Sequence, residues 1–231
     1  MRGTWLCEIC APTVPKLDIG ICYRCGGPTV SSCRLCPQLD PGIARARAVY
    51  PYTGWVANAV KTFKYAEEWD RATDLGARLE PVVREFGTLD GIVPVPLHPR
   101  KLRQRGYNQA ELLARQISTS LGIPVMPLLK RNRETRAQVE LGRDARHANV
   151  RDAFVLDPAW VPASGSRLLL LDDVRTTGAT VGACARTLLR TGPAAIYVAT
   201  VALDIPGADL RPWLDEHASL KDAGNDGSII W

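Results

Sequence analysis

Hydrophobic residues recur along most of the chain with the spacing of alternating strands and helices. Between residues 53 and 65, Val56, Val60 and Phe63 are three or four positions apart, which puts them on one face of a helix. Four consecutive leucines at 168–171 are instead typical of a strand buried on both faces. The same reasoning predicts strands at 44–52, 89–96, 125–129, 167–171 and 195–203, and helices at 53–65, 70–86, 108–121 and 179–190.

Strands that alternate with helices predict an α/β fold with a parallel sheet and crossover helices. Four segments lack this periodicity: the first 40 residues, the basic segment 98–106, the polar segment 130–149 and the residues after 204. We interpret 98–106 and 130–149 as loops, and the second is long enough to be functional. The expected organisation is a small module at 1–40, a main domain at 41–204 and a C-terminal tail at 205–231.

Composition and charge add one feature to this organisation, which is a local excess of basic residues in segment 98–151. The 231 residues are 46% hydrophobic and 23% charged, which excludes wholesale disorder. Segment 98–151 contains 12 Lys or Arg against 4 Asp or Glu, although the whole chain has a net charge of only +5. This excess favours a phosphate or nucleic-acid partner and equally fits a solvated basic surface. No apolar run has the length of a membrane span or a signal peptide, so we expect a cytoplasmic protein.

The strongest chemical signal follows the leucine strand, in the sequence Asp-Asp-Val-Arg-Thr-Thr-Gly-Ala-Thr at 172–180. Ligands of parallel sheets bind beyond the carboxyl ends of the strands, and a helix N-terminus favours phosphate. Gly178 would let the backbone approach a ligand closely, and hydroxyl donors would come from Thr176, Thr177 and Thr180. Asp172 and Asp173 would repel a phosphate but suit sugar hydroxyls or a Mg²⁺ ion. The alternative is a strand-turn-helix capped by threonine, with both acids solvated.

Six of the seven cysteines precede residue 37, in three Cys-x-x-Cys pairs: Cys7 and Cys10, Cys22 and Cys25, Cys33 and Cys36. Two such pairs can hold a tetrahedral Zn²⁺ through their thiolates. Two sets of four remain open, since the middle pair can combine with either the first or the third. Such a site would be structural, because no ligand position is left for a substrate. The alternative is a group of reduced thiols, and the isolated Cys184 is expected in the core.

Segment 172–180 resembles the phosphoribosyl pyrophosphate motif of type I phosphoribosyltransferases. The resemblance implies that Asp172 and Asp173 are the catalytic acids and contact the ribose hydroxyls. It also implies a cradle for the 5-phosphate formed by Val174, Arg175, Thr176, Thr177, Gly178, Ala179 and Thr180. The implied fold is a type I phosphoribosyltransferase-like parallel sheet, and Mg²⁺ would arrive with the pyrophosphate of the ligand.

Further segments are similar to the ComF family, which includes GntX-like proteins. They are residues 63–65, 93–97 and 105–109, and the spaced set Thr135, Gln138, Leu141, Arg146, Asn149, Val150 and Phe154. The resemblance covers about residues 5–203. It implies an N-terminal zinc ribbon before a phosphoribosyltransferase-fold domain. It also implies a role in natural competence, in the cytoplasm, on incoming single-stranded DNA.

Basic residues are the candidates for binding pyrophosphate or DNA: Lys64, Arg103, Arg105, Arg133, Arg136 and Arg146. Arginine suits bidentate recognition of phosphate, so Arg103 and Arg105 would neutralise a pyrophosphate. The resemblance places a flexible lid at 130–149, whose three arginines would close over the ligand or follow a single-stranded backbone. Lys64 is a candidate through the resemblance alone.

Three functions follow from these observations. The first is a ComF-family DNA-uptake factor that binds phosphoribosyl pyrophosphate, or a related phosphoribosyl or DNA-end group. The second is an active phosphoribosyltransferase of nucleotide metabolism or salvage, and the third is a zinc-ribbon nucleic-acid-binding module with a ligand-sensing domain. Expected cofactors are structural Zn²⁺ and Mg²⁺. Expected partners are a phosphorylated sugar, single-stranded DNA and DNA-uptake proteins, with no membrane span.

Overall fold

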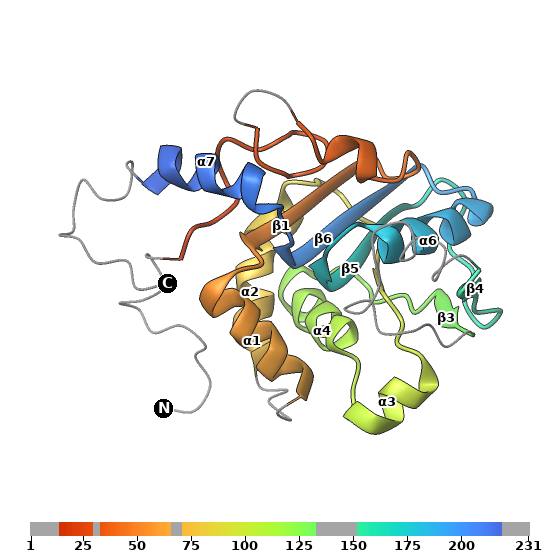
Figure 1. Ribbon diagram of the computed structural model, residues 1–231. Coiled ribbons are helices and arrows are strands. Elements are labelled where there is room, and N and C mark those ends of the chain that lie inside the picture. Colours follow the sequence, from red (N-terminus) through yellow and green to blue (C-terminus); the bar gives the residue numbers. More distant parts are fainter. Residues whose placement is uncertain (1–13, 30–32, 66–70, 133–151, 219–231) are drawn as a thin grey trace.

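The protein is built on a four-stranded parallel sheet with helices on both faces, seen in the computed structural model of Figure 1. The structure describes residues 14–29, 33–65, 71–132 and 152–218. The strand order is β1 (Arg45–Pro51), β6 (Ala195–Leu203), β5 (Arg167–Arg175) and β2 (Gly91–Pro94). Each neighbouring pair is parallel. The predicted α/β class with a parallel sheet is confirmed.

Helices α1 (Gly54–Tyr65), α2 (Arg71–Arg84) and α4 (Gln109–Leu121) cover one face of the sheet (Figure 1). Helix α6 (Ala179–Leu188) covers the other face, where α7 (Gly207–Ala218) packs onto the same core. The four leucines of β5 serve both cores, because side chains of a strand alternate between its faces. Leu168 and Leu170 lie in the core beneath α6, and Leu169 and Leu171 lie in the core beneath α2 and α4.

The Cys-rich segment packs onto the α6 face of the sheet. Leu35 and Leu39 belong to the same core as Leu168 and Leu170. The described part of this segment contains one short 3₁₀ helix, η2 (Cys36–Gln38), and an isolated bridge between Ile21 and Pro28. A small antiparallel pair, β3 (Leu129–Arg131) and β4 (Phe154–Leu156), adds to the same core. The boundaries expected at residues 40 and 204 stay predictions.

The structure departs from the predicted elements in four places. The segment expected as a basic loop forms a helix, α3 (Pro99–Arg105), so that prediction is wrong. Both ends of α3 are fixed by neighbouring residues. His98 caps the first turn, and Gly106 adopts the left-handed conformation directly after the last turn. Strand β5 continues to Arg175 because its end pairs with β6, and β3 begins later than the strand expected at 125–129. The expected tail contains α7.

Within the described ranges, we find no helix with the length and apolar composition of a membrane span.

Trp213 anchors α7, and its removal tests whether this helix is part of the folded unit. The indole is 1% exposed, and its Nε1–H donates to the carbonyl of Ile19 at 3.1 Å. We expect Trp213→Ala to lower the free energy of unfolding by about 3–5 kcal/mol, measured by urea titration. Trp55→Ala is the matched control, because Trp55 is 62% exposed, and we expect a change within about 0.5 kcal/mol. Equal effects of the two substitutions would contradict this packing.

Candidate functional site

The acid pair lies at the carboxyl end of β5, on the edge of the sheet where ligands of parallel sheets bind. Asp172 is paired with Thr200 of β6, so the backbone of the acid pair is held by the sheet. Asp173 is 6% exposed, whereas Asp172 is partly exposed. The backbone N–H of Asp173 donates to Oδ1 of Asp172 at 2.9 Å. The two carboxyl groups therefore have fixed and different environments.

The loop after the acids leads directly into the N-terminus of α6. Gly178 is the N-cap of this helix, with a φ of 76° that favours glycine. Glycine supplies no side-chain cap, and Thr177 Oγ1 accepts from the N–H of Ala179 only at 3.4 Å. Helices α3 and α4 differ, because their first turns are capped by the side chains of His98 and Asn108. The first turn of α6 is thus suited to an anion.

Lys64, a candidate through the resemblance alone, lies against the acid pair. Its Nζ is 3.0 Å from Oδ2 of Asp173, and its side chain is 24% exposed. Burial is the largest single effect and opposes the charge of this ammonium group, but the combined interactions with Asp173 and Asp172 raise the pKa of Lys64. The last turn of α1 therefore brings a cation to the carboxyl end of β5.

Residues 105–109 hold the end of α1 in this position. The Tyr107 hydroxyl donates to the carbonyl of Phe63 at 2.6 Å, and Gln109 Nε2 donates to the same oxygen at 3.4 Å. The rings of Phe63 and Tyr107 pack with centroids 6.2 Å apart. Two segments that are distant in sequence, 63–65 and 105–109, are thus in direct contact. Their contact positions Lys64.

The remaining residues of segment 105–109 tie α4 to the sheet edge. Asn108 caps the first turn of α4, because its Oδ1 accepts from the N–H of Ala110 at 3.2 Å, and its Nδ2 donates to the carbonyl of Val95 at 3.1 Å. Arg105 Nη1 donates to Gln109 Oε1 at 2.6 Å. Arg105 therefore supports the segment that holds Lys64.

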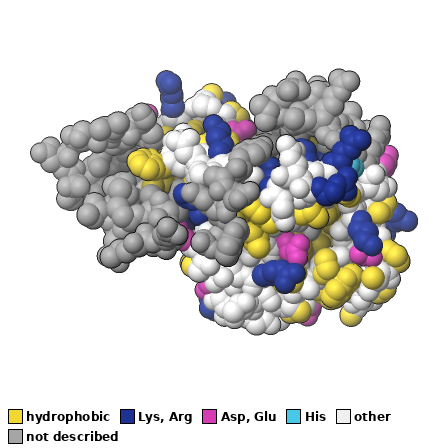
Figure 2. Space-filling model, turned by 90° about the horizontal axis from the view of Figure 1, so that it is seen from below, with side chains coloured by type: hydrophobic (Ala, Val, Ile, Leu, Met, Phe, Trp, Pro, Cys, Tyr) yellow, Lys and Arg dark blue, Asp and Glu magenta, His cyan; other side chains and the backbone are white. Residues whose placement is uncertain are grey.

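Helix α3 presents basic side chains to solvent. None of its residues is buried, and Arg103 is exposed. Figure 2 looks onto the side of the molecule where α3 lies in Figure 1, and Lys and Arg side chains gather in one area of this face. The other predicted cations, Arg133, Arg136 and Arg146, lie outside the described residues.

The charge state of Asp172 depends on three neighbouring groups. Burial, followed by repulsion from the Asp173 carboxylate, raises the pKa of Asp172 to about 7, although Lys64 and Arg131 oppose this rise. Sequence reasoning missed Arg131, because it lay in a segment expected to be a loop. In the structure it belongs to β3, with its guanidinium carbon 5.4 Å from the centre of the Phe154 ring. No local signal in the sequence connects Arg131 with Asp172.

Four cysteines form a second cluster, on the α6 face of the sheet. The Sγ atoms of Cys22, Cys25, Cys33 and Cys36 all lie within 4.8 Å of one another. The closest contacts join the two Cys-x-x-Cys pairs, at 3.3 Å for Cys22–Cys36 and 3.2 Å for Cys25–Cys33. A tetrahedral ion with Zn–S bonds of about 2.3 Å requires sulfurs about 3.8 Å apart, so the donor set fits a metal ion. Cys7 and Cys10 lie outside the described residues.

The thiols of this cluster have different proton affinities. Burial raises the pKa of Cys25 and raises that of Cys36 to about 11. For Cys22, burial is outweighed by hydrogen bonds from the backbone of Cys25 and from Cys36, which lower its pKa to about 7. A bound metal ion would displace the remaining protons. The backbone N–H of Gly27 also approaches Cys25 Sγ, at 3.4 Å.

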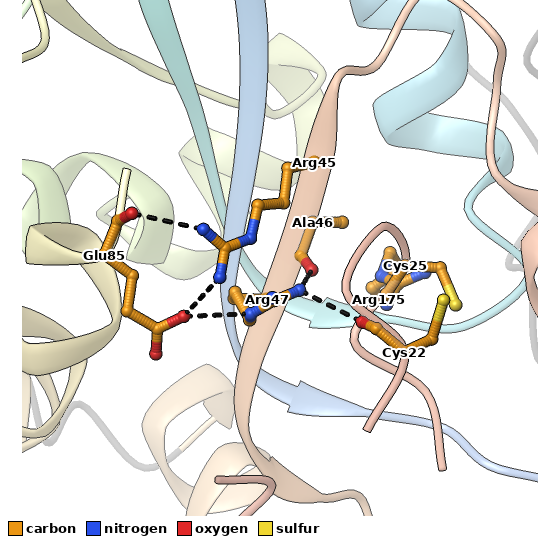
Figure 3. Close-up of polar contacts among 7 residues, drawn as sticks. All are labelled: Cys22, Cys25, Arg45, Ala46, Arg47, Glu85 and Arg175. Atoms are coloured by element: carbon orange, nitrogen blue, oxygen red, sulfur yellow. Dashed lines mark hydrogen bonds and ion pairs between the residues drawn. The ribbon is translucent and has the colours of Figure 1, made fainter. Parts of the chain in front are cut away.

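Two buried arginines, Arg47 and Arg175, lie beside Cys22 and Cys25 (Figure 3). Arg47 is 3% exposed, and it donates to the carbonyl of Cys22 at 3.3 Å and to Glu85 Oε2 at 3.0 Å. Arg175 is 4% exposed and donates to the carbonyl of Cys25. Burial lowers the pKa of Arg175 to about 10, and the nearby cysteines oppose this shift. The guanidinium of Arg175 thus lies among the cysteines, although its backbone belongs to the predicted phosphate cradle.

Comparisons with known proteins identify relatives over most of the chain. The DNA utilization protein YhgH of Salmonella typhimurium is 32% identical over 203 residues, which are 84% of this chain and 88% of that protein. Competence protein F of Haemophilus influenzae is 28% identical over 203 residues, with the same coverage of 84% and 88%. A purine phosphoribosyltransferase structure from Pyrococcus horikoshii aligns with 19% identity and a TM-score of 0.37, over 56% of this chain and 71% of that one. No family model matches the chain.

Asp172→Asn should change how stability depends on pH. The pKa of Asp172 is raised in the folded protein, so the folded state binds this proton more tightly than the unfolded state. Unfolding free energy contributed by this group therefore falls as the pH rises from about 4 to about 7. We expect Asp172→Asn to stabilise the protein relative to the wild type, and this gain should be larger at pH 8 than at pH 4 by at least about 1.4 kcal/mol, the value of one pKa unit, measured by urea unfolding. Glu80→Gln, on α2, removes a carboxylate from another element and is the matched control. An Asp172→Asn difference from the wild type that does not change with pH would contradict the assignment.

Proposed function

The chain belongs to the ComF family of DNA utilization and competence proteins, and on this premise we propose that it binds phosphoribosyl pyrophosphate, or a related phosphoribosyl or DNA-end group. The proposed site is the loop from Asp172 to Thr180. The observation that carries the proposal is the position of this loop: an acid pair ends a buried parallel strand, and a glycine-capped helix begins seven residues after the first acid. Sugar hydroxyls and a phosphate need these two environments side by side.

The residues of the loop have complementary roles in this proposal. Backbone N–H groups at the start of α6 and the hydroxyls of Thr176, Thr177 and Thr180 would bind the 5-phosphate. Asp172 and Asp173 would accept hydrogen bonds from the ribose hydroxyls. Lys64 would neutralise part of the negative charge that a pyrophosphate adds next to these acids. Mg²⁺, when bound with the pyrophosphate, would supply further neutralising charge.

The four clustered cysteines are proposed to hold a structural Zn²⁺. Thiolates are preferred ligands of zinc, and a set of four leaves no open position for a substrate. Both Cys-x-x-Cys pairs contribute, so one ion would join residues 22–25 to residues 33–36. Of the two sets considered from the sequence, the second and third pairs are therefore the proposed ligands.

Calorimetric titration of phosphoribosyl pyrophosphate, with and without Mg²⁺, tests the proposed ligand site. We expect the wild type to bind and an Asp172→Asn/Asp173→Asn variant to lose at least about tenfold in affinity, because both ribose contacts are weakened. We also expect Lys64→Met to weaken binding of phosphoribosyl pyrophosphate more than binding of ribose 5-phosphate, which lacks the pyrophosphate.

Glu80→Gln/Glu216→Gln is the matched control for this titration. It removes the same number of carboxylates, from α2 and α7, and should bind like the wild type. Absence of binding by a folded wild type would refute the proposed ligand. Equal loss in the control and in the acid-pair variant would refute the proposed site.

Contact with single-stranded DNA is a second proposed activity, supported by the charge of α3. This helix contains four cations, Arg100, Lys101, Arg103 and Arg105, and no acidic residue. It has no buried residue, so most of its surface is available to a partner. The names of the relatives, which refer to DNA utilization and competence, agree with such a partner. Phosphate contacts of this kind bind the backbone rather than a base sequence.

Reversing two charges on α3 tests this second activity. We expect Arg100→Glu/Arg103→Glu to weaken binding of a fluorescent single-stranded oligonucleotide at least about tenfold and to reduce the slope of log K against log salt. Arg190→Glu/Arg211→Glu makes the same change in net charge at exposed positions outside α3. The α3 proposal fails if both double variants bind the oligonucleotide with equal affinity.

A further inference from the structure

The loop between β5 and α6 touches the Cys-rich segment at both of its ends. At the strand end, the guanidinium of Arg175 donates to the carbonyl of Cys25. At the helix end, Gly178 packs against the backbone of η2, where a Cβ on Gly178 would lie 3.4 Å from the carbonyl oxygen of Gln38. Gln38 is two residues after Cys36. Both contacts therefore start from residues at, or next to, the four clustered cysteines.

The cysteines and the η2 contact are linked through Arg24. This residue lies between Cys22 and Cys25, and its guanidinium donates to the carbonyls of Cys36, Asp40 and Ile43 at 3.5, 3.3 and 3.5 Å. Asp40 in turn forms an ion pair with Arg186 of α6. A Cβ on Gly182, one turn into α6, would lie 3.2 Å from Cβ of Asp40. The segment after Cys36 is thus packed along the first turns of α6.

Arg175, the last residue of β5, makes the contact between this strand and the four clustered cysteines. It is 4% exposed, and among the described residues its Nε has no hydrogen-bond partner. A buried arginine with an unsatisfied donor is unfavourable unless negative charge lies nearby. A divalent ion held by four thiolates has a net charge of about −2, which would provide that compensation.

We propose that Arg175 is a positioning residue that couples metal binding at the four cysteines to the conformation of the loop from Arg175 to Gly178. Metal binding orders the Cys25 carbonyl and η2, and these hold the loop in the geometry that receives a phosphate. Removal of the metal loosens both contacts. The consequence for ligand affinity rests on the proposed function above, whereas the coupling between metal and loop does not. Because such coupling is reciprocal, a ligand on the loop would also strengthen metal binding.

Hydrogen exchange of the full chain, with zinc bound and after its removal by a chelator, tests the coupling without any substitution. We expect exchange in peptides covering 172–180 to rise about tenfold when zinc is removed. Peptides from α2 and α4 should change little. Unchanged exchange at 172–180 would overturn the proposal. A similar rise throughout α2 and α4 would also overturn it, because the metal would then stabilise the whole fold rather than this loop.

Arg175→Met tests the residue itself, with Arg190→Met, at an exposed position after α6, as the matched control. We expect Arg175→Met to exchange rapidly at 172–180 even with zinc bound, and to release zinc to a colorimetric chelator several times faster than the wild type. The control should behave like the wild type in both measurements. If the two variants release zinc at the same rate and show the same hydrogen exchange at 172–180, Arg175 does not provide the coupling.

Calorimetry on the same samples separates this proposal from the ligand assignment. If the wild type does not bind phosphoribosyl pyrophosphate but its loop responds to zinc, the ligand assignment fails and the coupling stands. If the wild type binds the ligand equally well with and without zinc, and its loop does not respond, the coupling fails alone. If both proposals hold, zinc removal and Arg175→Met should each lower ligand affinity about tenfold.

Discussion

Strand β5 pairs with a neighbour on each side, and this pairing fixes where the acid pair and the helices that cover the sheet can lie. β5 lies between β6 and β2, and its leucines alternate between two cores, so it cannot shift by one residue without moving Asp172 toward the interior. Burial of an uncompensated carboxylate would cost several kcal/mol, on the order expected for buried charges. The strand therefore has one register, and that register fixes where the acid pair emerges from the sheet.

Electrostatics at the end of β5 explain why distant segments meet there. Two adjacent carboxyl groups in a partly buried environment repel each other, and the raised pKa of Asp172 is the result. Lys64 offsets part of this repulsion through its contact with Asp173. Tyr107 and Gln109, which donate hydrogen bonds to the carbonyl of Phe63, help to hold Lys64 in that position. Contacts thus bring the segments 63–65 and 105–109 to the carboxyl end of β5.

The Cys-rich segment is connected to this site by packing and by buried charge. Leu35 and Leu39 share a core with β5, and Arg47 and Arg175 donate to cysteine carbonyls from β1 and β5. Arginine is suited to this role because its several donors can satisfy more than one acceptor at a time. Arg47, for example, contacts Cys22, Ala46 and Glu85. A bound metal ion would therefore influence strands of the main sheet as well as its own ligands.

Local patterns were sufficient for much of the fold and for part of the site. Hydrophobic periodicity predicted β1, β6, α1, α2, α4 and α6, because periodicity depends on neighbours a few residues apart. The acid pair and the helix that follows it were likewise predicted from the order of residues along the chain. The helix at 99–105 was missed, although Pro99 and Gly106 marked its ends, because its exposed surface has no apolar period. The contact of Lys64 with Asp173 and the direction of Arg175 toward the cysteines could not be predicted from the sequence. The direction and charge environment of a long side chain depend on partners from other strands and helices, and no spacing within its own segment determines them.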